Sequence, residues 1–444
     1  WIDRFQSWRR DLQKRAEVDE HSELDILTVA LIIEQAARRA SASDKKKLLE
    51  AIELLRDEDT SLSTKLTAAL SDDLLELVQR YPDRGGDTRY GKELAVVVDR
   101  EKARFSAWYE MFPRSSAAEP GVHGTFKDCE RLLSYVASMG FDTLYLPPIH
   151  PVGYTHRKGK NNSITAAADD PGSPWAIGSA EGGHKSIHPQ LGTVEEFRSF
   201  VAKAESLDLE VALDLAYQCS PDHPYVREHP EWFRWRPDGT VQFAENPPKK
   251  YQDIYPLDFT TEEWRALWEE LKSIVEFWRE QGIRIFRVDN PHTKPLPFWQ
   301  WLIDTVKQDH PEVIFLAEAF TRPKVMYRLG KLGFTQSYSY FTWRNTKAEI
   351  TEYFQELTQT EVREYFRPNL WPNTPDILPE YLQFGGRAAF MIRLVLAATL
   401  SGNYGIYGPA FELLENRPRE SGSEEYLDSE KYEIKHWNRA SADS

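Results

Sequence analysis

The sequence predicts an α/β fold, a closed (β/α)8, TIM-like barrel that follows a helical accessory segment. Three observations support this fold class. From about residue 105 onward, short apolar segments alternate with helix-like segments, which is the pattern of parallel βα units. The sequence holds eight such apolar segments, and eight strands close this barrel. Long loops follow the second and third segments, and long loops in a compact domain are usually functional.

The first hundred residues differ from the rest, because their apolar residues recur at helical spacing. Helices are expected at residues 2–18, 20–40, 43–57 and 74–81, with caps or turns at 41–44 and 60–64. Residues 82–91 are rich in turn formers and predict a linker. The apolar run 94–98 predicts a short strand at the end of another domain. We therefore assign residues 1–100 to a helical accessory segment and the end of an N-terminal domain.

The predicted strands and the helices between them define the barrel. Strands are expected at residues 106–112, 143–147, 210–217, 283–288, 313–317, 336–342, 367–371 and 403–407. Helices are expected at residues 126–139, 194–207, 261–281, 297–309, 323–332, 348–357 and 386–400. The catalytic barrel then covers residues 101–415, with inserts at 153–192 and 219–259, and residues 416–444 begin a C-terminal extension. An open doubly wound sheet is the alternative, but no glycine-rich phosphate-binding sequence follows the first strand.

Composition narrows the functional classes. The chain has 444 residues, a net charge of −15 and two cysteines, Cys129 and Cys219. The acidic charge argues against a nucleic-acid partner, since phosphate backbones require a basic surface. Two cysteines form neither a disulfide framework nor a metal-ligand spacing, so we expect a reducing cytoplasm and no metal. We also expect no membrane partner and no signal peptide, because neither apolar pattern occurs.

Acidic residues are expected at the carboxyl ends of barrel strands four, five and seven. Arg287 and Asp289 lie two residues apart at the end of strand four, so their side chains face the same side. The arginine keeps the aspartate ionised. Glu318 follows an almost wholly apolar strand, a setting that raises a carboxyl pKa and suits a proton donor. Asp376 is expected at the end of strand seven.

One acidic residue at a strand end is most often a cap or part of a surface ion pair. Three of them on one barrel are typical of retaining glycosidases, in which nucleophile and acid/base lie about 5–5.5 Å apart. We therefore expect Asp289 to be the nucleophile and Glu318 the general acid/base. Asp376 is expected to stabilise the positive charge of the transition state.

Four motifs resemble those of the α-amylase clan of barrel enzymes, over roughly residues 105–411. The nucleophile motif is similar to 287–289 (Arg-Val-Asp), and the acid motif is similar to 317–318 (Ala-Glu). Asp214 matches the aspartate of the clan's strand-three motif. The strand-seven motif is similar to 373–376 (Asn-Thr-Pro-Asp). The resemblance implies that Asp214 and Arg287 belong to the substrate-binding site.

Two positions depart from that clan. Gln218 and Cys219 stand where Asn-His is usual, and Pro375 stands where a histidine is usual. The clan's histidines contact the sugar at the cleaved bond, so their replacement argues against ordinary α-amylase activity.

These departures resemble one branch of the clan, the bacterial maltosyltransferases that use maltose 1-phosphate as donor and α-1,4-glucan as acceptor. Further similar stretches lie at residues 104–114, 157–162, 218–223, 246–255 and 289–295. The resemblance implies phosphate contacts from Lys158, Gln218, Asn246, Lys249, Tyr251 and Asn290. It implies no metal and no organic cofactor. It also implies a homodimer, and flanking β-sandwich domains that we expect to be absent or incomplete here.

The physical chemistry of a phosphorylated donor agrees with this resemblance. An acidic protein that binds a phosphate monoester needs local cations and N–H or O–H donors. Lys158 falls in the first predicted insert, while Lys249 and Tyr251 fall in the second. A single lysine is most often a solvated surface charge, but these loops converge on the catalytic face.

The predicted reaction is a retaining transfer. Asp289 attacks C1 of the maltosyl unit and displaces phosphate, which leaves a β-linked glycosyl-enzyme. Glu318 then deprotonates the 4-hydroxyl at the non-reducing end of the glucan. An α-glucan hydrolase is one alternative, because the same carboxylates serve hydrolysis. A non-catalytic glycan-binding barrel is the other.

Overall fold

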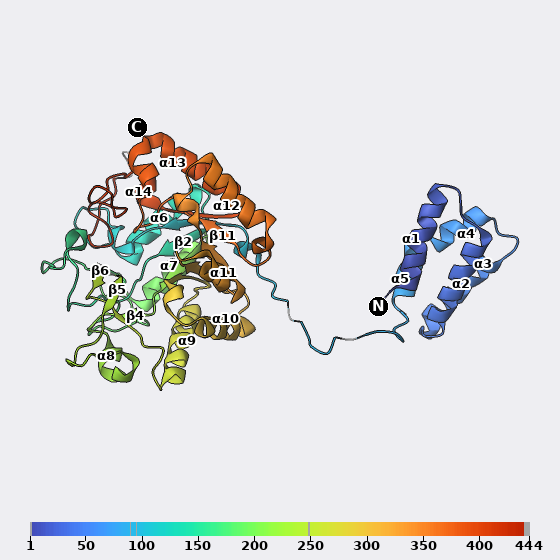
Figure 1. Cartoon of the computed structure of the whole chain (residues 1–444), viewed down its shortest axis with the longest axis horizontal. Helices are drawn as coiled ribbons and strands as arrows, with labels where there is room; N and C mark the ends of the chain where they lie inside the picture. The colour runs from blue at the N-terminus through green and yellow to red at the C-terminus, as the bar shows by residue number, and fades with distance from the viewer. Residues whose placement is uncertain (1, 89, 95, 247–248, 439–444) are drawn as a thin grey trace. The chain divides into compact units, whose positions relative to one another are not determined.

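The computed structural model describes residues 2–88, 90–94, 96–246 and 249–438. The chain divides into two units, Trp1–Val97 and Val98–Ser444 (Figure 1). The described part of the first unit is helical, and the second unit contains a closed barrel. None of the described helices combines the length and the apolar character that a membrane span requires.

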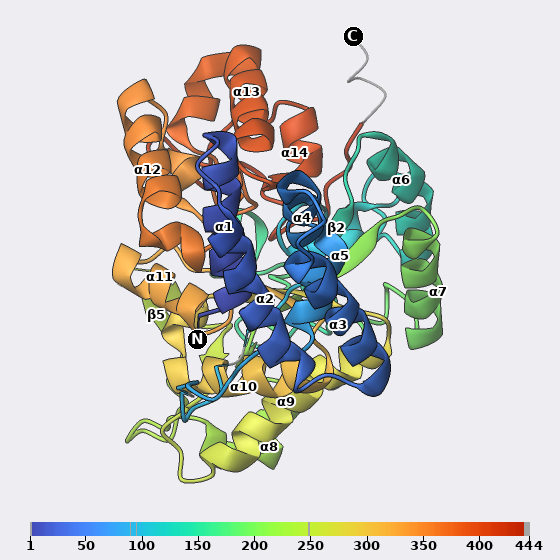
Figure 2. The ribbon, with the colours of Figure 1, turned by 90° about the vertical axis from the view of Figure 1, so that its right-hand side faces the viewer.

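The first unit packs its helices around one buried apolar cluster, which includes Ile26, Ile33 and Leu48. The helices are α1 (Arg4–Glu17), α2 (Glu23–Ala37), α3 (Ala42–Arg56), α4 (Leu62–Ala69) and α5 (Asp72–Gln79), and Figure 2 shows them in blue. An aspartate or serine side chain caps the start of each one. The predicted helices are confirmed. The sequence did not predict α4, because residues 60–64, which include its first turn, predict a cap or turn.

The run that follows the bundle is not a strand. The exposed fractions of Val96, Val97 and Val98 are 83%, 71% and 81%, and no described strand pairs with them. The predicted strand at 94–98 is therefore wrong for these residues, and Ala95 lies outside the described residues. A strand exists only where a neighbouring strand shares its backbone hydrogen bonds. Apolar composition alone cannot supply that neighbour.

The barrel closes in the order β1, β2, β3, β8, β9, β10, β11, β12 and back to β1, and each neighbouring pair is parallel. The strands are β1 (Ser106–Glu110), β2 (Thr143–Leu146), β3 (Glu210–Leu215), β8 (Ile285–Asp289), β9 (Ile314–Glu318), β10 (Gln336–Tyr338), β11 (Pro368–Leu370) and β12 (Asn403–Tyr407). The predicted barrel is confirmed, although several strands are shorter than expected.

Helices cover the outside of the barrel, as Figure 1 shows. They are α6 (Phe126–Ser138), α7 (Val194–Glu205), α9 (Trp264–Glu280), α10 (Leu296–Asp309), α11 (Pro323–Lys331), α12 (Lys347–Gln359), α13 (Glu380–Leu400) and α14 (Gly408–Glu412). The predicted helices are confirmed, but α13 begins before residue 386. Gly386 breaks that helix with φ 55° and ψ −160°, a conformation that favours glycine, and the sequence predicted only the part after this break.

The two predicted inserts contain short regular elements of their own. In the second insert, β4 (Gln218–Cys219) pairs with β7 (Tyr255–Pro256), and β5 (Ala244–Asn246) forms an antiparallel hairpin with β6 (Lys249–Tyr251). A short helix, α8 (Pro224–Glu228), lies between them in sequence. The predicted strand at 210–217 ends at Leu215, because the chain then leaves the barrel and pairs with β7 instead.

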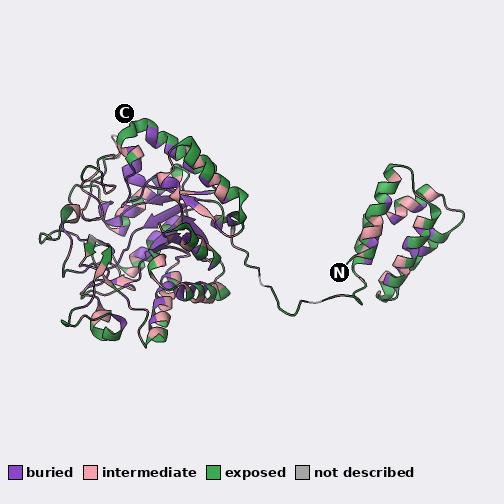
Figure 3. Ribbon diagram, viewed as in Figure 1, coloured by how far each residue is buried: buried purple, intermediate pink, exposed green. Residues whose placement is uncertain are grey.

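Inward-facing side chains fill the barrel in layers, and the strands appear as buried in Figure 3. The middle layer is rich in aromatic side chains, which are Trp108, Tyr145, Tyr338 and Trp371, and also holds aliphatic ones such as Leu316. Above it, at the carboxyl ends of the strands, lie charged side chains. The barrel interior is therefore a packed core with a polar layer at the carboxyl ends of its strands.

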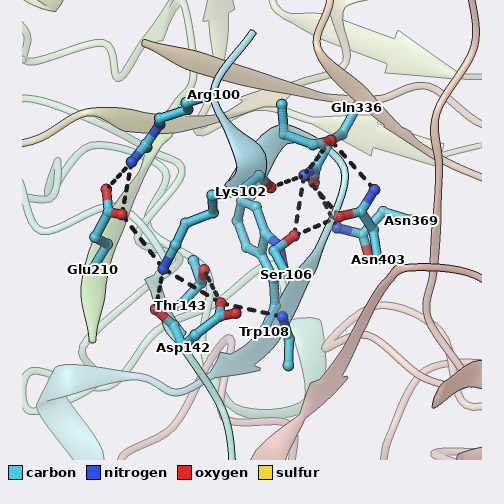
Figure 4. A network of polar contacts seen from close by, with 12 residues as sticks. Arg100, Lys102, Ser106, Trp108, Asp142, Thr143, Glu210, Gln336, Asn369 and Asn403 are labelled. Atoms are coloured by element: carbon cyan, nitrogen blue, oxygen red, sulfur yellow. Dashed lines mark hydrogen bonds and ion pairs between the residues drawn. The ribbon is translucent and has the colours of Figure 1, made fainter. Parts of the chain in front are cut away.

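A polar network closes the amino-terminal end of the barrel (Figure 4). The side-chain nitrogen of Gln336, at the start of β10, lies 3.0 Å from Ser106 Oγ and 3.1 Å from Asn403 Oδ1. The same nitrogen reaches the carbonyl oxygens of Lys102 and Ala103, at 3.1 and 3.2 Å. Gln336 thus attaches the segment before β1 to the amino-terminal end of the barrel.

Ion pairs that do not involve Gln336 also hold the segment before β1. Arg100 pairs with Glu210 at 2.7 Å. Asp99 pairs with Lys307 at 2.7 Å and with Arg367 at 2.8 Å. These ion pairs attach residues 99 and 100, at the start of the second unit, to the rest of that unit.

We expect Gln336→Met to lower the free energy of unfolding by about 2–4 kcal/mol, because several buried acceptors lose their donor. The matched control is Gln355→Met on the exposed face of α12, which should change stability by less than about 0.5 kcal/mol. Urea unfolding of both variants measures this difference. Equal stability of the two variants would contradict the role of the network.

Candidate active site

Neighbouring strand ends place the predicted carboxylates opposite one another. In the register of β8 and β9, Asp289 lies across from Glu318, and in that of β3 and β8, Asp214 lies across from Arg287. Adjacent strands are about 4.8 Å apart, so these side chains share one small space. Asp289 and Glu318 are the last residues of β8 and β9, while Arg287 and Asp214 lie within β8 and β3.

Arg287 connects the carboxylates directly. Its Nη1 lies 2.8 Å from Asp289 Oδ1 and 2.8 Å from Asp214 Oδ2, and its Nη2 lies 3.0 Å from Glu318 Oε1. The arginine side chain is buried. Removing one member of such a buried group leaves uncompensated charge, so the arrangement is held as a unit.

Asp214 holds the Arg287 side chain in place. Its Oδ2 accepts hydrogen bonds from the Tyr145 hydroxyl at 2.6 Å and from Trp175 Nε1 at 3.2 Å, besides the bond from Arg287. Burial raises the pKa of Asp214 to about 7, against the opposing charge of Arg287. Asp214 therefore acts on the site through Arg287.

The two catalytic candidates differ in protonation. Burial alone raises the pKa of Asp289, but the charges of Arg287, Lys294 and Lys431 outweigh it and hold that pKa below its usual value. Burial raises the pKa of Glu318 to about 8, with Arg287 opposing this rise and Asp289 adding to it. These are the directions that the sequence predicts. At neutral pH, Asp289 is an anion and Glu318 holds a proton.

The residue after Asp289 has an unusual backbone conformation. Asn290 has φ 43° and ψ 54°, in the left-handed region, and its backbone N–H donates to Glu318 Oε2 at 3.3 Å. Lys294 Nζ donates to the carbonyl oxygens of Asp289 and Asn290, at 3.3 and 3.4 Å. Strained backbone of this kind gathers at functional sites, and here it orients an amide toward the acid.

Asp376 lies beyond the end of β11, in the loop that leads to α13. Its Oδ1 is 2.6 Å from Lys431 Nζ. That nitrogen also lies 4.7 Å from the centre of the Trp175 ring. Since Trp175 donates to Asp214, Asp376 joins the other carboxylates through these two side chains.

The sequence did not predict Lys431, Trp175 or Tyr145. Lys431 lies in the residues assigned to the C-terminal extension, and Trp175 lies in the first insert; neither has a local motif. The sequence did contain a signal for Tyr145. This residue lies in the predicted strand 143–147, and every second side chain of a barrel strand faces the interior.

The predicted phosphate-binding residues lie mainly around the hairpin of β5 and β6. Lys158 is buried, and its Nζ donates to the carbonyl oxygen of Lys250 and to Gln252 Oε1, both at 3.4 Å. Asn246 is exposed at the end of β5, and Tyr251 is half-buried in β6. Lys249 is in β6 across from Asn246, and its side chain lies outside what the structure describes.

A buried acid lies within the electrostatic influence of lysines from both the hairpin region and the carboxylate site. Asp253 is buried, and burial raises its pKa against the charges of Lys158 and Lys431. Lys431 is the partner of Asp376. Among the described residues, no hydrogen bond or ion pair joins the hairpin directly to Asp289.

Gln218 and Cys219 form β4, beside the catalytic end. Gln218 Nε2 donates to the carbonyl oxygen of Trp175 at 3.3 Å. Cys219 is buried, and burial raises the pKa of its thiol well above its usual value. Gln218 thus lies next to Trp175, and Cys219 is packed as a neutral residue.

Cys219 lies in a cluster with His184 and His223, in which one ligand atom of each residue lies within 4.8 Å of the others. Hydrogen bonds already use the imidazole nitrogens. The backbone N–H of Tyr225 donates to His223 Nδ1 at 3.0 Å, so the proton of His223 is on Nε2, 3.0 Å from His184 Nδ1. His184 Nε2 then donates to the carbonyl oxygen of Ala216 at 2.9 Å. A metal ion would have to break this chain.

These buried histidines give a pH-dependent stability. Burial lowers the pKa of His184 to about 4, whereas the unfolded chain has about 6.5. The unfolded state therefore binds more protons below about pH 6.5, and stability is lost as pH falls toward about 4. Asp214 and Glu318 titrate in the opposite sense, because their pKa values are raised.

A variant isolates the histidine contribution. Between pH 7 and pH 5, His184→Gln should lose about 2 kcal/mol less of unfolding free energy than the unmodified chain. Urea unfolding at both pH values measures this. Identical pH dependence of the two proteins would show that His184 is not held neutral.

Taken together, the contacts bring Asp214, Arg287, Asp289, Glu318 and Asn290 into one network. They can support an anionic nucleophile beside a protonated acid, which is the requirement for a retaining displacement at a sugar carbon.

Solved structures of α-amylases share this fold. An alpha-amylase from Lactobacillus plantarum matches with a TM-score of 0.55 and 22% identity, over 74% of this chain and 76% of that one. A maltogenic alpha-amylase from Thermotoga neapolitana matches with a TM-score of 0.57 and 22% identity, over 74% and 72%.

Sequence relatives are much more similar. The family model for alpha-1,4-glucan:maltose-1-phosphate maltosyltransferase, domain N/S, matches residues 1–100. The protein of that name from Chlorobaculum tepidum is 59% identical over 99% of this chain, and the chain spans 65% of its length. The one from Cereibacter sphaeroides is 52% identical over 99% of this chain, which spans 73% of it. The chain therefore belongs to the alpha-1,4-glucan:maltose-1-phosphate maltosyltransferase family.

Proposed function

We propose that this chain carries out retaining transfer of a maltosyl unit from maltose 1-phosphate to an α-1,4-glucan, with release of phosphate. The observation that carries the proposal is the pair formed by Asp289 and Glu318. They face each other across β8 and β9, share Arg287, and have pKa values shifted in opposite directions. The names of the relatives support the choice of substrates.

In the proposed first half-reaction, the Asp289 carboxylate attacks C1 of the maltosyl unit from the face opposite the phosphate. The C1–O bond to phosphate breaks, and a β-linked glycosyl-enzyme forms. Glu318 donates its proton to the departing phosphate oxygen and is left as a carboxylate. Asp376 offsets the positive charge that develops at C1.

In the second half-reaction, Glu318 works as the base. It removes the proton of the 4-hydroxyl at the non-reducing end of the glucan, and that oxygen displaces Asp289 from C1. Two inversions retain the α configuration.

Donor recognition is proposed for the residues of the second insert and its surroundings. Lys158, Lys249 and Tyr251 supply cations and a hydroxyl, and Gln218, Asn246 and Asn290 supply amide donors. The location of Lys158 against the β5–β6 hairpin supports this grouping.

Incubation with maltose 1-phosphate and maltohexaose tests the proposal. We expect release of phosphate together with glucan products longer by two glucose units. Free maltose from starch, without phosphate dependence, would support the hydrolase instead. Glucan binding without turnover would support the non-catalytic barrel.

The donor site makes a separate prediction. Lys158→Met should raise the KM for maltose 1-phosphate by about 10- to 100-fold, since a charge-assisted contact to phosphate is lost. With α-maltosyl fluoride, which has no phosphate, KM should change little. Initial rates with both donors measure this, and an equal loss with both would argue against a phosphate contact.

We also propose that residues 101–415 form the catalytic domain, with residues 1–100 and 416–444 as accessory segments. A cytoplasmic location and a homodimer complete the proposal, on the basis of the family resemblance. Sedimentation velocity should give the mass of two chains, and a monomer at all concentrations would contradict the dimer.

A further inference from the structure

One buried acid in the polar layer at the carboxyl ends of the barrel strands has no part in the proposed mechanism. Glu110 is the last residue of β1, where it lies in register with Tyr145 of β2 and Tyr407 of β12. Trp108, two residues earlier, is in the aromatic layer inside the barrel, so Glu110 faces the interior as well, one layer nearer the catalytic end.

Glu110 is 1% exposed, and its Oε2 has no hydrogen-bond partner among the described residues. Asp214 has the same deficiency on its other oxygen. Its Oδ2 accepts hydrogen bonds from three side chains, whereas its buried Oδ1 accepts none from the described residues. A buried polar atom without a partner destabilises the folded state, and such groups persist mainly where they serve function.

Burial raises the pKa of Glu110 well above its usual value, and the charges of Asp214, Asp376 and Glu318 add to this rise against that of Arg287. Glu110 is therefore a neutral acid at neutral pH, with one O–H to donate. The titratable and charged groups that interact electrostatically with Glu110 are Tyr145 of β2, Asp214 of β3, Arg287 of β8, Glu318 of β9, Tyr338 of β10, Tyr407 of β12, Asp376 of the β11–α13 loop and Tyr426.

We propose that Glu110 shares its proton with Asp214 and thereby positions Arg287 on the two catalytic carboxylates. One acid lacks an acceptor and the other lacks a donor, so a single O–H···O⁻ bond from Glu110 to Asp214 Oδ1 satisfies both. Bonds of this charge-assisted kind are short and strong. No covalent bond changes, and the proton stays within the pair.

The consequence reaches the site through Asp214 and Arg287. Because Asp214 accepts this hydrogen bond, it stays an anion at lower pH and keeps its contact with Arg287 Nη1. The same Nη1 contacts Asp289, and Nη2 contacts Glu318. Glu110 is thus a positioning residue that acts through two others.

Two variants of similar shape separate this role from simple packing. Glu110→Gln keeps an N–H donor for Asp214, so kcat/KM should stay within about threefold and its acidic limb should not move. Glu110→Met removes the donor, so the pKa of Asp214 rises. The acidic limb of the kcat/KM profile should then move up by about one to two pH units.

An infrared difference spectrum tests the proton itself without any activity. At pH 7, the unmodified chain minus Glu110→Gln should show the C=O stretching band of one protonated carboxyl. A carboxylate band in that difference would overturn the proposal, and so would an unmoved acidic limb in a folded Glu110→Met variant. If Glu110→Met does not fold, as judged by circular dichroism, the infrared result still decides.

The activity readout rests on the proposed function, but the infrared readout does not. If the unmodified chain releases no phosphate from maltose 1-phosphate, the proposed function fails and the infrared bands still decide whether Glu110 is protonated.

Discussion

Asp289→Asn is expected to lower kcat for phosphate release by about 10⁴-fold or more, because the amide cannot form the glycosyl-enzyme. The side chain is buried beside Arg287, and asparagine has nearly the same shape, so the fold should survive. Rates of phosphate release from maltose 1-phosphate with maltohexaose measure this effect.

Asp304→Asn is the matched control, because it makes the same chemical change at an exposed position of α10. It should leave kcat unchanged. Activity of Asp289→Asn close to that of this control would show that the nucleophile is elsewhere.

The second large effect is expected for Glu318→Gln, which should reduce transfer to maltohexaose by about 10²- to 10⁴-fold. The pKa of Glu318 is about 8, so the unmodified chain should lose kcat/KM for the donor as pH rises through that value. The variant has no group to deprotonate there, so its alkaline limb should be absent.

Glu352→Gln on the exposed face of α12 is the control for this change and should keep both the rate and the limb. An alkaline limb that persists in Glu318→Gln would assign the titration to another group and would contradict the role of Glu318 as the acid.

The barrel and its carboxylates could be predicted from the sequence because both follow from local patterns. The cited barrel strands have four to six residues and are mostly apolar, and a charged residue at the last position of β8 and of β9 marks the carboxyl end of the strand. Asp289 and Glu318 are such residues. Their environments, one beside an arginine and one after an apolar strand, also indicated the directions of their pKa shifts.

The other contacts of the site join residues that are far apart in the sequence, and the spacing of apolar residues does not predict such contacts. Lys431 reaches Asp376 from 55 positions away in the chain, and Trp175 reaches Asp214 from 39. Both come from irregular segments whose paths are determined by tertiary packing. The strand expected at 94–98 failed for a related reason, since a strand needs a partner that the run itself cannot specify.

The network around Glu110 also required the structure. In the sequence, Glu110 is one acid in the aromatic run 108–112, and nothing local marks it as buried and without a partner. Its relation to Asp214 appears only when β1, β2 and β3 lie side by side in the barrel.

The central claim is that Asp289 carries the sugar during transfer, and trapping that intermediate tests it most directly. Glu318→Gln is incubated with α-maltosyl fluoride, whose fluoride leaves without an acid, and no acceptor is added. Mass spectrometry of the digested protein should find one maltosyl unit on the peptide that contains Asp289. A maltosyl unit on a different residue, or free maltose formed with no adduct and with inverted configuration, would contradict the account.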